Sequence, residues 1–219
     1  MTPEPDPACS LCPRLTAFRQ TNAETFPAYF NGAVPSFGGE DARLLIVGLA
    51  PGLHGANQTG RPFTGDFAGD LLYATLLEMG LAQGAYAGHA EDGLTLNASM
   101  ISNAVRCVPP QNKPTGPEIK ACRPFLRARI DALPNLQVIL ALGRVAHEST
   151  VAAFGLRQKA YPFAHGARHE LTPALALYDS YHCSRYNTNT GRLTPEMFRS
   201  VFAAIRDALA EPPALAKTG

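Results

Sequence analysis

The stretch LLIVGLA at residues 44–50 decides the fold of this chain. It is a continuous apolar run that closes with glycine and alanine and is followed by Pro51, a pattern typical of a strand buried on both faces of a parallel sheet. Three later stretches have the same character: MISNAVRC at residues 100–107, VILALG at 138–143 and ALALYDSYH at 174–182. Such strands require a helical layer above and below them, because both of their faces must be covered.

The segments between these strands supply the helices. Apolar residues recur at helical spacing from Asp66 to Met79, and Gly80 is suited to end that helix. Further helices are predicted at residues 14–20, 118–133, 144–154 and 194–209, and a hairpin is predicted within 161–171. This alternation predicts an α/β fold in which a mainly parallel sheet lies between helices. We expect one domain over residues 1–219, with an N-terminal arm at 1–43 and a loose C-terminal tail at 210–219.

Composition limits the possible partners and location. Charged residues make up 17% of the chain and the net charge is only +1, so a nucleic-acid partner would have to be bound by a local basic cluster. No stretch approaches the ~20 apolar residues that span a bilayer. The N-terminus, MTPEPDPACS, lacks the basic and apolar regions of a signal peptide. We therefore expect a cytoplasmic protein, and a monomer by default.

Unusual polar sequence follows three of the predicted strands. The three segments are GLAPGLHGANQTGRPFTGD at residues 48–66, SNAVRCVPP at 102–110 and HCSRYN at 182–187. In an open parallel sheet the carboxyl ends of the strands meet at one edge, so we expect these segments to converge there. The first segment has neither the G-K-[ST] of a phosphate-binding loop nor the G-x-G-x-x-G of a dinucleotide fold. A binding site of another kind is indicated.

Four of the five cysteines form a candidate metal site. Cys9 and Cys12 make a C-x-x-C pair, and fourteen residues separate Cys107 from Cys122. In a reducing compartment metal binding is the more expected use of such thiols, and four of them can hold a 4Fe–4S cluster or a zinc ion. Spacing alone does not separate these two. Buried, unbonded cysteines are the alternative, and they would suit Cys107 at the end of a strand.

Together these motifs resemble those of the family-5 uracil-DNA glycosylases, the iron–sulfur-containing type B branch of the uracil-DNA glycosylase superfamily. Residues 48–66 resemble the first motif of that family, and SNAVRCVPPQNKP at 102–114 resembles the Asn-bearing strand and cysteine loop shared by families 4 and 5. YHCSRYNTNTGRLT at 181–194 resembles the second motif, which normally reads H-P-S. The resemblance implies a three-layer α/β/α sandwich with a four-stranded, mainly parallel sheet. It also implies a 4Fe–4S cluster on Cys9, Cys12, Cys107 and Cys122.

The resemblance further implies a reaction on DNA: a uracil nucleotide is flipped out of the helix and its N-glycosidic bond is hydrolysed. Phe63 is then the stacking platform for the base, and Asn103 is the amide that reads its edge. His182 is the donor to the anionic leaving group, and Asp66 is the carboxylate that positions the attacking water. Each has a plainer alternative. Phe63 would suit core packing, Asn103 and His182 would suit backbone groups at strand ends, and Asp66 would suit a helix N-cap.

Supporting roles at the substrate follow from the same motifs. The residues concerned are Ala50, Gly52, His54, Ser184, Arg185 and Asn187. Arg185 is assigned either to a phosphate contact or to the gap left by the flipped base, with a solvated side chain as the alternative. Family 4 carries an acidic residue where this chain has Leu49, and its absence leads us to expect that hypoxanthine and modified uracils are accepted beside uracil. Cys183 replaces the proline of H-P-S, and we expect no ligand or nucleophile role for it.

Three other functions compete with this one. A uracil-DNA crosslinking protein would carry a nucleophilic histidine after the Asn-bearing strand, but residues 108–121 read VPPQNKPTGPEIKA. A non-catalytic iron–sulfur module that binds nucleic acid would bind without releasing a base. A nucleotide-processing enzyme would require a phosphate-binding lysine, which the glycine-rich segment lacks.

Overall fold

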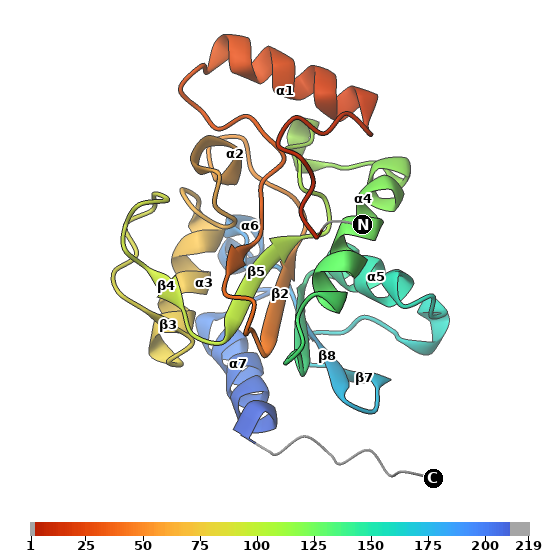
Figure 1. Cartoon of the computed structure of the whole chain (residues 1–219). Helices are drawn as coiled ribbons and strands as arrows, with labels where there is room; N and C mark the ends of the chain where they lie inside the picture. The colour runs from red at the N-terminus through yellow and green to blue at the C-terminus, as the bar shows by residue number, and fades with distance from the viewer. Residues whose placement is uncertain (1–2, 211–219) are drawn as a thin grey trace.

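The computed structural model describes residues 3–210 of the protein (Figure 1). The loose tail expected at 210–219 therefore lies outside the described residues, except for Ala210.

A central sheet of six strands organises the described chain, in the order β1-β5-β2-β6-β8-β7. Its strands are β1 Phe37–Gly38, β2 Leu44–Gly48, β5 Ser99–Asn103, β6 Val138–Leu142, β7 Arg168–Thr172 and β8 Leu175–Ser180. The four inner strands are parallel, as the sequence predicts. The expected number of four strands was wrong, because β1 and β7 add antiparallel edges. β1 is two residues long, too short to produce a period-two pattern.

Two helices cover each face of the sheet. Side chains of α3, Phe67–Glu78, and α7, Pro195–Ala210, enter one core. Side chains of α4, Gly116–Asp131, and α5, Arg144–Ala153, enter the other. The fold is thus the expected three-layer α/β/α sandwich. The remaining elements are α1 Pro13–Thr25, α2 Ala56–Thr59, α6 Arg185–Asn189, the small sheet of β3 Ala82–Gln83 and β4 Thr95–Leu96, and two 3₁₀ turns at Pro110–Asn112 and Gln158–Ala160.

Strand β2 shows how the sequence builds both cores at once. Leu44 and Ile46 belong to the core under α3 and α7, while Leu45 and Val47 belong to the core under α4 and α5. Since successive strand residues point to opposite faces, a five-residue apolar run fills both layers. All four side chains are fully buried. The strand ends at Gly48, where the polar segment begins.

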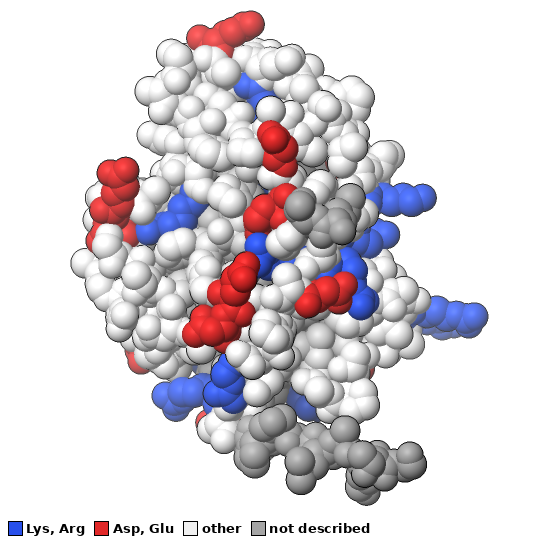
Figure 2. All heavy atoms as spheres, in the orientation of Figure 1, with Lys and Arg blue, Asp and Glu red and all other residues white. Residues whose placement is uncertain are grey.

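Helix length and surface charge are the features that would mark a membrane-spanning segment or a basic band. No helix within residues 3–210 combines the length and apolar character needed to cross a bilayer. On the face shown in Figure 2, basic and acidic side chains of the described residues are interspersed among uncharged ones, without a continuous basic band. This distribution agrees with the net charge of +1.

Candidate active site

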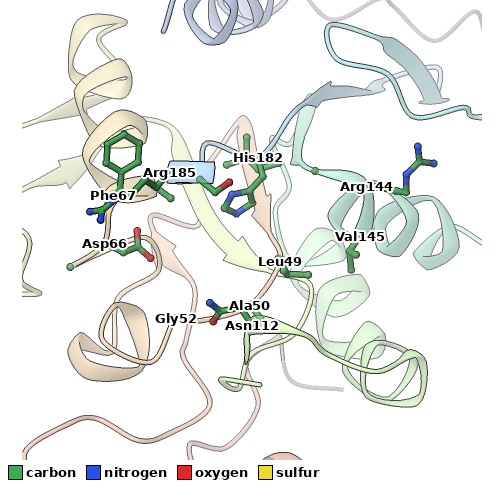
Figure 3. A pocket seen from close by; sticks show the side chains of 15 residues that line it. Leu49, Ala50, Gly52, Asp66, Phe67, Asn112, Arg144, Val145, His182 and Arg185 are labelled. Carbon is green, nitrogen blue, oxygen red and sulfur yellow. The ribbon is translucent and has the colours of Figure 1, made fainter. Parts of the chain in front are cut away.

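A cavity of about 670 Å³ opens at the carboxyl edge of the sheet, where the first and third polar segments meet. The first segment and the start of α3 contribute Leu49, Ala50, Gly52, Gly65, Asp66, Phe67 and Ala68 to its wall. The third contributes His182, Ser184 and Arg185. Figure 3 shows Asp66 and His182 directed into the same space from different segments, with Ala50 and Gly52 opposite. The predicted convergence of these two loops is therefore present.

Asp66 combines a capping role with a place in the cavity wall. It precedes α3, and its Oδ1 accepts a hydrogen bond of 2.9 Å from the backbone N–H of Gly69. A Cβ built on Gly55 would lie only 2.9 Å from its Oδ2, and one on Gly52 would lie 3.5 Å away. These two glycines therefore let the loop pass close to the carboxylate. Burial raises the pKa of Asp66, and hydrogen bonds from backbone N–H groups at the start of α3 oppose that rise.

His182 is a partly buried imidazole whose ring nitrogens are left open. Burial lowers the pKa of His182 to about 4, so the ring is neutral near pH 7. No hydrogen-bond partner for its ring nitrogens is found in residues 3–210. Its backbone is held instead, because its carbonyl oxygen accepts a hydrogen bond of 2.8 Å from Asn187 Nδ2. A neutral imidazole of this kind presents one N–H to whatever enters the cavity.

Phe63 and Asn103 are not among the residues that form the cavity wall, although Phe63 contacts His182, which is. The Phe63 ring stacks on the His182 ring, with 5.9 Å between centroids and 25° between planes. A Cβ on Gly48 would lie 2.4 Å from Asn103 Oδ1 and 2.6 Å from two carbons of the Phe63 ring. Both side chains are thus packed directly over the Cα of Gly48. The amide of Asn103 makes no hydrogen bond within the described part of the chain, although the residue is 3% exposed.

The other predicted substrate residues fall into two groups. Ser184 lines the cavity and caps α6 through a 3.4 Å bond from the N–H of Asn187, and Arg185 stacks its guanidinium 5.4 Å from the centre of the Phe67 ring. Asn187 acts on the His182 backbone and is not part of the wall. His54 is not brought to the wall either, since its Nδ1 pairs with the hydroxyl of Tyr29 at 3.0 Å, on the N-terminal arm.

Several residues of the wall were missed by the sequence analysis, among them four that come from two further loops. Gly143, Arg144 and Val145 follow β6, and Asn112 comes from the loop between the two distant cysteines. The rule that gathers loops at the carboxyl ends of strands applies equally to β6 and would have found the first three. Asn112 carries a weaker signal, its place in a proline-rich loop. It is held at φ 55, in the left-handed region that asparagine tolerates better than most residues.

Comparison with known proteins identifies this architecture. The sequence profile described as the Uracil DNA glycosylase superfamily matches residues 35–206. The chain belongs to the uracil-DNA glycosylase superfamily. It is 48% identical over 199 residues to a type-5 uracil-DNA glycosylase of Thermus thermophilus, covering 89% of this chain and 90% of that protein. It is 41% identical over 208 residues to a type-5 uracil-DNA glycosylase of Mycobacterium leprae, covering 91% and 90%. A type-4 uracil-DNA glycosylase of Sulfurisphaera tokodaii is 29% identical over 180 residues, with 77% and 73% covered.

Within this superfamily member the fifth cysteine has a structural place. Cys183 is fully buried, and its Sγ donates to the backbone carbonyl of Ala68 at 3.4 Å. Burial also raises the pKa of its thiol far above the usual value. It therefore packs the end of β8 against the start of α3, which the proline of the motif cannot do by hydrogen bonding.

The four remaining cysteines converge on one small apolar cavity, lined also by Leu11, Leu15, Val105 and Phe125. None is in a disulfide. Burial raises the pKa of Cys107 to about 12 and that of Cys122 to about 11, and the neighbouring cysteine charges add to both shifts. The backbone N–H of Arg106 donates to Cys122 Sγ at 3.4 Å. The arm, the loop after β5 and α4 are thus joined at a set of soft ligands, which suits a thiolate-bound metal group.

A second polar cluster within the described chain is held by hydrogen bonds. His147 Nδ1 lies 2.8 Å from Asp179 Oδ1, His147 Nε2 lies 2.8 Å from the carbonyl oxygen of Tyr161, and His169 Nε2 lies 3.2 Å from Asp179 Oδ2. Burial opposes a charge on His147, but the bond to Asp179 outweighs it and raises the pKa of His147. Both ring nitrogens of His147 face acceptors, so a protonated ring ties α5 to β8.

Proposed function

We propose that this chain is a uracil-DNA glycosylase that releases uracil from DNA by hydrolysing its N-glycosidic bond. The observation that carries the proposal is the pairing of Asp66 and His182 across one cavity at the carboxyl edge of the sheet. Membership of the superfamily and the similarity to type-5 uracil-DNA glycosylases support the same activity. The partner would be DNA that carries uracil, and the chain would act as a monomer in the cytoplasm. Size-exclusion chromatography checks the monomer.

The side chains would divide the chemistry among them. The flipped base would have to pass the cavity wall at His182 to stack on Phe63 and be read by the free amide of Asn103, because neither residue lines the cavity itself. The C1′–N1 bond breaks with its electrons moving to uracil, and the neutral His182 N–H would stabilise the negative charge on the base. Asp66 would hold the water whose oxygen forms the new bond to C1′ and would accept its proton. One well-aimed donor to a developing anion is typically worth ~3 kcal/mol.

We further propose that the four converging cysteines hold a 4Fe–4S cluster in preference to zinc. A tetrahedral zinc ion with Zn–S bonds of about 2.3 Å brings its sulfurs to about 3.8 Å from one another. In residues 3–210 the one group of three potential ligands within 4.8 Å of one another is His147, His169 and Asp179, so no three of the cysteines meet that limit. The wider set suits a cluster that spaces its ligands further apart. When bound, the group would tie the arm to the loop after β5.

Wider substrate acceptance is supported by one feature of the wall. Leu49 and Ala50 line the cavity and offer it only apolar side chains, so neither of these two residues rejects a larger or differently substituted base by a polar contact. We propose that hypoxanthine and modified uracils are also released. Base release from duplexes that carry each lesion tests this, and strict uracil-only activity would contradict it.

The decisive experiment compares the wild type with Asp66→Asn and His182→Ala in a single-turnover uracil-release assay. Asparagine keeps the N-cap of α3 but loses the carboxylate, so the fold should be retained while the rate falls by at least about 100-fold. The rate of uracil release by His182→Ala should fall by a similar factor, about 100- to 1,000-fold. A wild type that binds uracil-containing DNA without releasing base would refute the proposed function. If Asp66→Asn kept full activity, Asp66 would act only as the N-cap of α3 and would have no part in the reaction.

A further inference from the structure

The backbone of Phe63 is held in a conformation that phenylalanine avoids. Its φ is 56°, in the left-handed region where a Cβ-bearing residue is disfavoured. Such a residue persists only when its surroundings determine it, and it often marks a functional position. The carbonyl oxygen of Phe63 explains part of the constraint, because a Cβ on Gly69 would lie 1.8 Å from it. The turn is therefore pressed against the first turn of α3.

Two tyrosine hydroxyls fix the carbonyls on either side of this φ angle. The Tyr73 hydroxyl donates to the carbonyl oxygen of Pro62 at 2.7 Å, and the Tyr86 hydroxyl donates to the carbonyl oxygen of Phe63 at 3.3 Å. The Tyr86 hydroxyl also accepts from the N–H of Gly65 at 3.4 Å. The two tyrosine rings stack on each other, with 4.6 Å between centroids. Both peptide planes that flank the Phe63 Cα are thus bonded to the same pair of stacked rings.

A buried ion pair holds the tyrosines in place. Arg61 makes a bidentate pair with Asp92, at 2.8 Å and 2.7 Å, and the two side chains are 4% and 0% exposed. Its Nε donates to Thr64 Oγ1 at 2.8 Å, and its guanidinium lies 5.2 Å from the Tyr73 ring centre and 5.9 Å from that of Tyr86. Asp92 in turn accepts from two backbone N–H groups of its own loop.

Asp92 and Tyr86 come from the loop between β3 and β4, which no part of the proposed chemistry uses. Figure 1 shows this hairpin beside α3. The hairpin touches the candidate active site through Phe63, whose ring stacks on His182. We propose that Arg61, Tyr73, Tyr86 and Asp92 form a clamp that positions Phe63 for base stacking. This inference rests on the proposed function, since it assigns Phe63 to the flipped base.

The clamp makes a prediction that simple structural support does not. A positioning residue for the base should affect only steps in which a base occupies the site. Binding to DNA that carries a tetrahydrofuran abasic analogue needs the cavity rim and the phosphate contacts but no stacked base. The effect of loosening Phe63 should therefore appear in uracil release and in inhibition by free uracil, and not in abasic binding.

Tyr86→Phe is the sharpest test, because it removes one hydroxyl and keeps the stacked ring. We expect its single-turnover rate to fall about five- to tenfold, the effect of one lost hydrogen bond at a positioned group. The inhibition constant of free uracil should rise by a similar factor, while the Kd for abasic DNA stays within about twofold of wild type. Tyr161→Phe is the matched control, since within the described chain the Tyr161 hydroxyl makes no hydrogen bond and Tyr161 lies outside the cavity wall.

The outcomes separate the clamp from the function on which it rests. A wild type without uracil release would remove the proposed function itself. An active wild type with Tyr86→Phe at the wild-type rate would overturn the clamp alone. If Tyr86→Phe lost both the rate of uracil release and the affinity for abasic DNA, the clamp would also be overturned, because that result would show general damage to the fold. Asp92→Asn serves as a second variant if circular dichroism shows that it is folded. Like Tyr86→Phe, it should lower the rate of uracil release and raise the inhibition constant of free uracil.

Discussion

Gly48→Ala places a single methyl group between the two side chains assigned to the base. The new Cβ would lie 2.4 Å from Asn103 Oδ1 and 2.6 Å from the Phe63 ring. To restore an ordinary contact of 3.4 Å, the amide must retreat by about 1 Å and the ring by about 0.8 Å. Both residues are buried, at 3% and 6% exposure, so neither can swing out into solvent to avoid the new methyl group.

A displacement of about 1 Å at a positioned group typically costs about 100-fold in rate. We therefore expect the single-turnover rate of uracil release by Gly48→Ala to fall about 100-fold. Overpacking of a filled site should also lower the free energy of unfolding by about 1–3 kcal/mol, which thermal denaturation measures. Gly116→Ala is the control, because its Cβ meets nothing within 4 Å. A Gly48→Ala enzyme that cleaves at the wild-type rate would show that Asn103 and Phe63 do not act on the base.

Three further predictions test other parts of the structure. Activity should fall as the pH drops through the raised pKa of Asp66, because the ionised carboxylate is required. The residual activity of Asp66→Asn should lack this loss at low pH. If the variant keeps the same loss, another group is responsible for it. Asp92→Ala should lower the free energy of unfolding by about 3–5 kcal/mol in denaturant titrations, since its buried cationic partner loses its counter-charge. The hydrogen bonds from Arg61 lower the pKa of Asp92, so this stability should be present above pH ~4 and lost as the pH falls further, and a flat profile would contradict it. Asn112→Gly should slow uracil release several-fold while Gln111→Gly does not, because both relieve a φ of 55° but only Asn112 lines the cavity; equal rates would exclude Asn112 from the site.

The four inner strands of the sheet could be predicted because they depend on local sequence pattern. The apolar runs at β2 and β6 fill two cores at once, so their sequence has one structural solution. The strand predicted at residues 100–107 was too long. β5 ends at Asn103, and the chain beyond it runs on to Cys107 at the cysteine cavity. The antiparallel edge β1 was not predicted, because it is set by its pairing with β5 and carries no pattern of its own. The hairpin predicted within residues 161–171 was misplaced, since the antiparallel pair is formed by β7 and β8.

The site residues that lie at or after strand ends could be predicted from the sequence. The residues whose place depends on partners far away in the sequence could not. Asp66 lies in the polar segment after the first predicted strand and His182 at the end of the last one, and the topology brings them together. The link between Arg61 and Asp92 joins residues far apart in sequence through a loop with no periodic signal. Such contacts are decided by how the hairpin packs on α3, which propensity and spacing do not specify.

Asp66 shows that one carboxylate can combine a helix cap with a place in the cavity wall. Its Oδ1 accepts the N–H of Gly69 and so belongs to the helix, while Oδ2 is the oxygen nearest Gly52 and Gly55. The cap fixes the plane of the carboxylate, and that fixed plane aims the second oxygen along the loop that borders the cavity. A carboxylate held in this way loses little freedom when it orients a water, because the helix has already ordered it. Asp66→Asn therefore measures the second oxygen alone: the amide keeps the acceptor that caps α3 and removes the charge that a water would meet.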